Sequence, residues 1–147
     1  MNLSERLNDD MKQAMRSQEK FKLTTIRMVR ASIQNLEIDL KRSLEDSEVI
    51  DILSREIKQR KDSLQEFEKA GRDDLAKDVA AEIEIISVYL PQQLTEEEIK
   101  VIVQQTIQET GASSKAEMGK VMSALLPKVK GRADGKLVNT FVQQFLQ

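Results

Sequence analysis

The sequence predicts an all-α protein in two parts: an N-terminal helical bundle or hairpin domain over residues 1–90 and a small three-helix C-terminal domain over residues 91–147. Apolar residues recur three and four positions apart along most of the chain, which is the period of an amphipathic helix. No segment alternates apolar and polar residues for long enough to predict a strand. Leu, Ile, Val and Phe supply 41 of the 147 residues, enough to build a packed core.

Four helices are expected in the N-terminal domain, each with one apolar face. The first helix begins at Ser4 as its N-cap, and the second runs from Phe21 to Ser43. The third runs from Ser47, its N-cap, to Gly71, and the fourth from Asp73 to Pro91. Their apolar faces comprise Leu7, Met11 and Ala14; Ile26, Val29, Ile33, Leu36 and Leu40; Val49, Leu53, Ile57, Leu64 and Phe67; and Leu75, Val79, Ile83, Ile86 and Leu90.

Three shorter helices are expected after Pro91, and capping patterns mark where they begin. A Ser or Thr followed three residues later by Glu forms a capping box, in which side chains satisfy the first free N–H groups of a helix. The first of these helices is expected to begin at the capping box of Thr95 and Glu98 and to end at Gly111. The second begins at the capping box of Ser114 and Glu117 and ends at Pro127, and the third begins at Asp134.

The chain has no cysteine and no histidine. It therefore forms no disulfide and cannot use a thiolate or an imidazole in nucleophilic catalysis. It also lacks the usual side-chain ligands for zinc and for iron–sulfur clusters. We predict no catalytic residue, no metal site and no cofactor for the chain on its own. The first residues lack the apolar run of a signal peptide, and no stretch approaches the roughly 18 apolar residues of a membrane span. We expect a cytoplasmic protein without membrane contact.

Basic charge is concentrated in the C-terminal part. Residues 1–90 carry 16 basic and 19 acidic side chains, whereas residues 115–136 carry six basic and two acidic ones. The segment Lys128–Lys136 holds four cations and two glycines and leads into a helix N-terminus, where free N–H groups favour an anion. This combination suits a phosphate of RNA, although the pattern of a nucleotide-binding P-loop is absent. The alternative is a solvated loop in which Asp134 caps the helix and the glycines make the turn.

Two other charged clusters are better explained as ordinary surface. Carboxylates two residues apart lie on different faces of a helix, which argues against a shared magnesium ion. The basic side chains of the second and third helices are interspersed with acidic ones, which favours ion pairs within the bundle over a phosphate-binding stripe. The acidic residues are Glu37, Asp39, Asp46, Glu48 and Asp51, and the basic ones are Arg27, Arg30, Lys41, Arg42, Lys58, Arg60 and Lys61.

The runs from Glu117 to Met122 and from Pro127 to Asn139 resemble the C-terminal signature of the GatB/YqeY family. Upstream pieces resemble free-standing bacterial YqeY proteins, so the resemblance covers nearly all of the chain. The resemblance implies a helical N-terminal domain and a C-terminal domain similar to the tail domain of the GatB subunit of glutamyl/aspartyl-tRNA amidotransferase. A YqeY-like module is also appended to some glutaminyl-tRNA synthetases, and in both settings it is associated with tRNA binding. The upstream pieces are Asp62-Ser63 with Phe67, the run from Ala70 to Ala76, and the run from Tyr89 to Leu94.

Three functions remain open from the sequence. The first is a cytosolic accessory module that binds tRNA. The second is a component of an amidotransferase complex, a carbon–nitrogen ligase with glutamine as amido donor, whose partners include an aminoacyl-tRNA synthetase or an amidotransferase. The third is a protein-interaction module that uses the N-terminal bundle. For the first, the expected phosphate contacts are Lys128, Lys130, Arg132 and Lys136, with Gly131 and Gly135 permitting close approach and Lys120 joining if its helix packs alongside.

Overall fold

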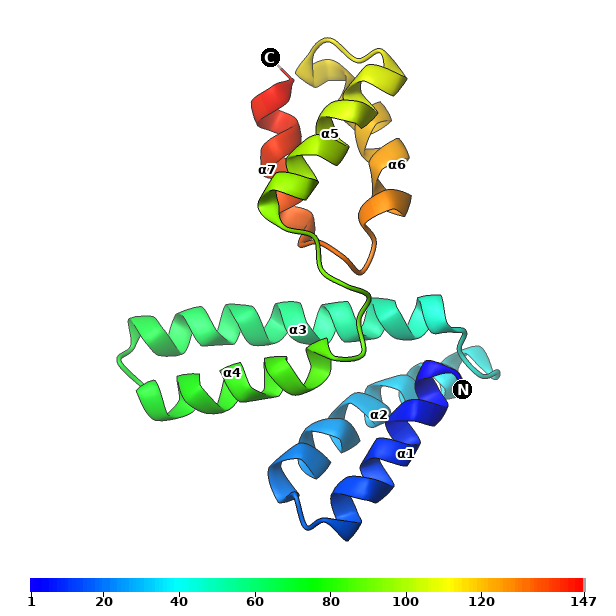
Figure 1. Cartoon of the computed structure of the whole chain (residues 1–147), viewed down its shortest axis with the longest axis vertical. Helices are drawn as coiled ribbons and strands as arrows, with labels where there is room; N and C mark the ends of the chain where they lie inside the picture. Colours follow the sequence, from blue (N-terminus) through cyan, green and yellow to red (C-terminus); the bar gives the residue numbers. More distant parts are fainter. Residues whose placement is uncertain (147) are drawn as a thin grey trace. The chain divides into compact units, whose positions relative to one another are not determined.

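The structure, a computed structural model, describes residues 1–146 and is helical throughout, with no β-strand among these residues (Figure 1). The prediction of an all-α fold is confirmed. The chain divides into two compact units, Met1–Leu90 and Pro91–Gln147. Each unit has its own cluster of buried apolar side chains.

The first unit consists of two helical hairpins. Helix α1 (Leu3–Arg16) lies beside α2 (Lys20–Leu40), and α3 (Asp46–Lys69) lies beside α4 (Asp73–Ser87), as Figure 1 shows. The expected apolar faces supply most of the core, because the helical period places these residues on one side of each helix. The buried apolar residues that form this cluster are Leu7, Ile26, Val29, Ile33, Leu44, Val49, Ile52, Leu53, Ile57, Ile86 and Tyr89.

Two helices of the first unit begin earlier than the sequence analysis expected. The N-cap of α1 is Asn2, whose side chain accepts a hydrogen bond from the Glu5 backbone, while Ser4 lies inside the helix. The backbone N–H of Leu3 also donates to the Asp46 carboxylate at 3.0 Å, which fixes the start of α1 against the start of α3. Helix α3 is capped by Glu45 rather than by Ser47.

Two helices of the first unit also end early. Helix α2 stops at Leu40, because Lys41 adopts a left-handed conformation with φ +57°. Helix α4 stops at Ser87 instead of continuing to Pro91. The Tyr89 N–H bonds the Ile86 carbonyl three residues back, a tighter turn that places the Tyr89 ring in the core, 4% exposed.

The second unit contains three α-helices and a short 3₁₀ turn. These are α5 (Glu96–Thr110), η1 (Lys115–Glu117), α6 (Met118–Val129) and α7 (Gly135–Phe145). The capping box of Thr95 and Glu98 and the left-handed Gly111 confirm the expected ends of α5. The buried apolar residues that the three helices share are Ile99, Val103, Val121, Leu125, Val129, Val138, Phe141, Val142 and Leu146.

Two expectations about α6 are wrong. The Ser114 side chain makes no capping hydrogen bond, and a 3₁₀ turn precedes the helix. Pro127 does not end α6, which continues to Val129. A proline in the last turn removes one helical hydrogen bond. Burial of the Val129 side chain, which is 3% exposed in the core, offsets this loss of stability. Lys128 therefore belongs to the helix, and the loop that follows is shorter than predicted.

Candidate functional site

The loop between α6 and α7, residues 130–134, is a tight turn. Its backbone reverses at Gly131, which has φ +72°, a conformation that glycine adopts without steric cost. The N–H groups of Arg132 and Ala133 both bond the Val129 carbonyl, at 2.9 and 3.2 Å. These bonds close the end of α6 and fix the path of the loop. We call residues 130–134 the α6–α7 loop.

The α6–α7 loop is joined to the segment that precedes α5. The Leu94 N–H donates to the Arg132 carbonyl at 2.8 Å, and the Gln93 amide donates to the Gly131 carbonyl at 2.8 Å. The Arg132 guanidinium donates in return to the Gln92 carbonyl at 3.3 Å. Three hydrogen bonds thus hold the loop in one position against residues 92–94, so its shape exists before any ligand binds.

Lys128 is engaged within the unit. Its ammonium donates to the Glu109 carboxylate at 2.7 Å and to the Thr106 hydroxyl at 2.9 Å. Both partners are on α5, and the Thr106 side chain is itself buried. A phosphate would have to displace the Glu109 carboxylate to reach Lys128, which makes this residue a weaker phosphate ligand than its position in the sequence suggested.

The remaining cations differ in exposure. Lys130, the first residue of the loop, and Lys136, in the first turn of α7, are exposed, whereas Arg132 is partly buried. The pKa of the Glu98 carboxyl lies below its ordinary value, chiefly because the backbone N–H and the hydroxyl of Thr95 donate to it; the nearby Arg132 charge adds to the effect. The Arg132 charge thus contributes to the lowered pKa of the Glu98 carboxyl, after the two hydrogen bonds from Thr95.

The N-terminus of α7 is not an open anion site. The Asp134 carboxylate accepts the Lys136 N–H at 2.9 Å, as the cap prediction required. This carboxylate occupies one free donor and places a negative charge where an anion would bind. Gly135 is exposed at the first position of α7, and a Cβ added to it would meet no atom within 4 Å.

Lys120 does not join the loop cluster. It is exposed near the start of α6, whereas the loop follows the end of that helix. Ten residues separate Lys120 from Lys130, or about 15 Å along a helix. The structure therefore brings Lys130, Arg132 and Lys136 to one end of the unit and leaves Lys120 towards the other.

Two basic residues of the charged clusters in the first unit, Arg42 and Arg60, form ion pairs. Arg60 contacts Glu56 at 2.6 Å and Glu82 at 2.9 Å, and Arg42 contacts Glu48 at 2.8 Å. Among residues 1–146 no three acidic side chains gather closely enough to hold a metal ion. No helix in this part of the chain is both long and apolar enough to span a membrane.

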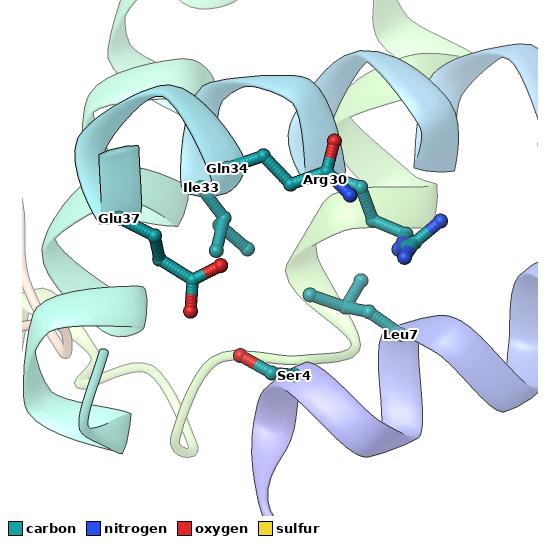
Figure 2. A pocket seen from close by; sticks show the side chains of 6 residues that line it. All are labelled: Ser4, Leu7, Arg30, Ile33, Gln34 and Glu37. Carbon is teal, nitrogen blue, oxygen red and sulfur yellow. The ribbon is translucent and has the colours of Figure 1, made fainter. Parts of the chain in front are cut away.

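One pocket in the first unit was not foreseen. It lies between α1 and α2, and Figure 2 shows the Ser4 hydroxyl and the Glu37 carboxylate pointing into it. Its volume of about 60 Å³ is enough for a few water molecules. The Ser4 hydroxyl has no protein hydrogen-bond partner. The pocket depends on how α1 packs beside α2, so only the structure reveals it.

A second unforeseen feature surrounds Tyr89. Its hydroxyl donates to the Asp10 carboxylate at 2.5 Å, and the Arg6 guanidinium lies 4.8 Å from the ring centre. Burial, followed by the hydrogen bond and charge of Asp10, raises the pKa of Tyr89 above its ordinary value. Arg6 also donates to the Val88 carbonyl at 3.3 Å. The cluster ties the end of α4 to α1 and explains why the only tyrosine of the chain is buried.

Comparison with known proteins identifies relatives in fungi. "Altered inheritance of mitochondria protein 41, mitochondrial" of Pyrenophora tritici-repentis is 33% identical over 142 residues, which are 95% of this chain and 78% of that protein. Proteins of the same name in Lachancea thermotolerans and Kluyveromyces lactis are each 42% identical, over 58% and 56% of this chain. The match spans less than half of these two yeast proteins, 46% and 45% of their lengths.

These relatives correct the expected location. Each is named as a mitochondrial protein, so the assignment of the chain to the cytoplasm is wrong by this comparison. The expectation depended on the absence of a signal peptide and of cysteine, and neither feature distinguishes the cytosol from the inside of another compartment. The bacterial origin implied by the resemblance also finds no support in these fungal relatives.

The family is established by a match over almost the whole chain. The family described as "Yqey-like protein" matches residues 4–146, a range that includes both compact units. The Pyrenophora relative agrees with this extent, since it aligns with 95% of the chain. The chain belongs to the Yqey-like protein family.

Proposed function

We propose that the second unit is an RNA-binding module, that tRNA is its ligand, and that the protein acts as an accessory to tRNA-dependent chemistry carried out elsewhere. The observation that carries the proposal is a pair of exposed lysines, Lys130 at the start of a loop held in place by hydrogen bonds and Lys136 just after it. A prearranged pair of cations binds phosphates without the cost of ordering a flexible segment. The resemblance to tRNA-associated tail domains supports the choice of tRNA.

The other basic residues take different roles in this proposal. Lys130 and Lys136 contact phosphates directly. Arg132 is a positioning residue, because it holds the loop to the Gln92 carbonyl. Lys128 stabilises the α5–α6 contact through Glu109 and adds to the positive potential without contacting RNA. The Gly131 turn allows the sugar–phosphate backbone to approach the loop closely.

Titration of labelled tRNA at several salt concentrations tests the proposal. Each phosphate contact contributes roughly 0.7–0.9 to the slope of log affinity against log salt, so two contacts account for about a sevenfold to twelvefold loss when salt rises fourfold. The variant Lys130→Gln/Lys136→Gln should bind tRNA more weakly and lower the slope by about 1.4–1.8. The matched control is Lys58→Gln/Lys77→Gln, which removes two exposed lysines from the first unit.

The two variants separate specific from general electrostatic binding. The proposal requires the loop variant to lose affinity while the control variant keeps it. Equal losses would show that tRNA responds only to total charge. Unchanged affinity in the loop variant, with intact helical circular dichroism, would mean that the α6–α7 loop is not the RNA site.

A further inference from the structure

The outer face of α2 is exposed along its whole length and is largely apolar. Phe21, Met28 and Ile38 are 44%, 47% and 71% exposed, although each is a large hydrophobic side chain. At 3.6 residues per turn they fall within an arc of about 100°, opposite the side that packs in the core. We call this arc the α2 outer face; it comprises Phe21, Thr24, Met28, Ala31, Asn35 and Ile38, all exposed and none of them charged.

Charge flanks the α2 outer face at its two ends with opposite signs. Lys20 lies at the first position of α2 and Asp39 at the penultimate one, and both are exposed. No salt bridge within residues 1–146 involves either side chain. The face therefore has an uncharged middle, with Lys20 at one end and Asp39 at the other. The exposed cap residues Glu19 and Lys41 lie just beyond these ends and carry the opposite charges.

We propose that the α2 outer face docks the same face of a second copy of the chain, with the two α2 helices antiparallel. In this arrangement a residue i faces the partner's residue near 59 − i. Lys20 then lies level with Asp39 of the other copy, so both ends form opposite-charge pairs. The antiparallel orientation also places the positive N-terminal end of each helix dipole beside the negative C-terminal end of the other.

The middle of the face is self-complementary in size as well. Met28 faces Ala31 of the other copy, so a long flexible side chain meets a small one, and this happens twice about the two-fold axis. Phe21 lies level with Ile38, and Thr24 lies level with Asn35, whose amide can hydrogen-bond a hydroxyl. A parallel pairing would place Lys20 beside Lys20 and Asp39 beside Asp39, which like-charge repulsion disfavours. A second copy in the antiparallel sense is thus the occupant that the charges favour.

The size of the face sets the expected strength. One pair of helices buries less than the roughly 800 Å² per partner of a standard interface, so a weak and concentration-dependent dimer is expected. We expect a dissociation constant weaker than about 1 μM, with a measurable dimer below about 1 mM.

Charge reversal tests the pairing of the two helix ends. In sedimentation equilibrium of the full chain, Lys20→Glu and Asp39→Lys should each weaken dimerisation by about twofold to thirtyfold, because each alters two exposed ion pairs per dimer. The variant Lys20→Glu/Asp39→Lys should recover the dimer, since the pairs are restored with signs exchanged. Lys77→Glu on α4 is the control and should leave dimerisation unchanged. Failure of the double variant to recover would overturn the antiparallel pairing.

Cross-linking tests the register independently of charge. The chain has no cysteine, so a single introduced thiol is unambiguous. Two copies of Ala31→Cys lie about 5 Å apart along the helix axis in the proposed dimer, whereas two copies of Ile38→Cys lie about 26 Å apart. A short bis-maleimide should therefore link Ala31→Cys into covalent dimers and leave Ile38→Cys monomeric. Equal cross-linking at both positions, or a wild-type chain that stays monomeric up to about 1 mM, would refute the proposal.

Discussion

Replacing Arg60 with methionine will destabilise the first unit, because Arg60 bridges two carboxylates from different helices. Its guanidinium donates to Glu56 on α3 at 2.6 Å and to Glu82 on α4 at 2.9 Å, and its side chain is only 9% exposed. The substitution Arg60→Met keeps a long apolar stem in place but removes the positive charge. Two carboxylates, 17% and 22% exposed, then face each other without a cation.

The magnitude follows from these contacts. Hydrogen bonds to charged groups contribute roughly 1.5–3 kcal/mol each. The two bonds to carboxylates are lost, together with the weaker bond from Arg60 to the Glu56 carbonyl at 3.2 Å. Partial hydration of both carboxylates and the buried methionine side chain offset part of this loss. We expect the free energy of unfolding to fall by about 2–4 kcal/mol, within the range for breaking partly buried ion pairs.

Urea unfolding followed by tyrosine fluorescence measures this change in the first unit alone. Tyr89 is the only tyrosine, the chain has no tryptophan, and the ring is buried in the core of the first unit. The variant Glu56→Gln/Arg60→Met/Glu82→Gln is the matched control, because it removes the charges that Arg60 neutralises. It should recover most of the lost stability.

Two results would refute this reasoning. A loss below about 1 kcal/mol in Arg60→Met would mean that the bridge is solvated and contributes little, as surface pairs do. A triple variant no more stable than Arg60→Met would show that lost packing of the arginine stem, and not unpaired charge, is the cause.

Four further predictions concern pH and helix ends. Because the pKa of Tyr89 is raised by burial and by Asp10, its contribution to stability is complete below about pH 10 and is lost as pH rises through the folded-state pKa; urea unfolding from pH 8 to 12 checks this. Thr95→Ala should destabilise the second unit by about 1 kcal/mol, measured by amide exchange in α5. The lowered pKa of Glu98 makes its contribution to stability present above about pH 4 and lost as pH falls through the folded-state pKa, visible as smaller α5 protection factors after correction for the intrinsic exchange rate. Gly111→Ala should cost about 1 kcal/mol through backbone strain alone, since φ is +69° and no atom lies within 4 Å of the added Cβ.

Control variants or contrary results follow for the Tyr89, Gly111 and Thr95 predictions. Asp10→Asn should bring the tyrosine titration, followed by absorbance, closer to its ordinary range; an unchanged titration would contradict the role given to Asp10. Gly119→Ala, inside α6 with ordinary helical φ and open space, should be neutral or stabilising. If Gly111→Ala were equally harmless, the strain argument would be wrong. Loss of Thr95 without faster exchange in α5 would show that the capping box contributes nothing.

The sequence determined the features that depend on neighbours within about one helical turn. The 3.6-residue period predicted the helices, and the capping box at Thr95 and the caps at Gly111 and Asp134 predicted where several begin or end. Asn2 followed by Glu5 is also a local capping pattern, so the true start of α1 was readable from the sequence. Residue composition likewise excluded chemistry that needs cysteine or histidine, without reference to any fold.

The tertiary structure decided that Lys128 is engaged within the second unit. Lys128 is separated from Thr106 and Glu109 by 22 and 19 residues, yet it bonds both, because α6 continues past Pro127 to bury Val129. Spacing alone shows four similar cations in this segment and cannot rank them.

The shape of the α6–α7 loop was equally beyond the sequence. It depends on hydrogen bonds from Gln93 to Gly131 and from Arg132 to Gln92, which join residues 38 and 40 positions apart. The same holds for the bridge between Arg60 and Glu82, 22 residues apart on different helices. A local pattern shows that such groups can form hydrogen bonds or ion pairs, but the partner is chosen only when burial of apolar faces brings distant helices together.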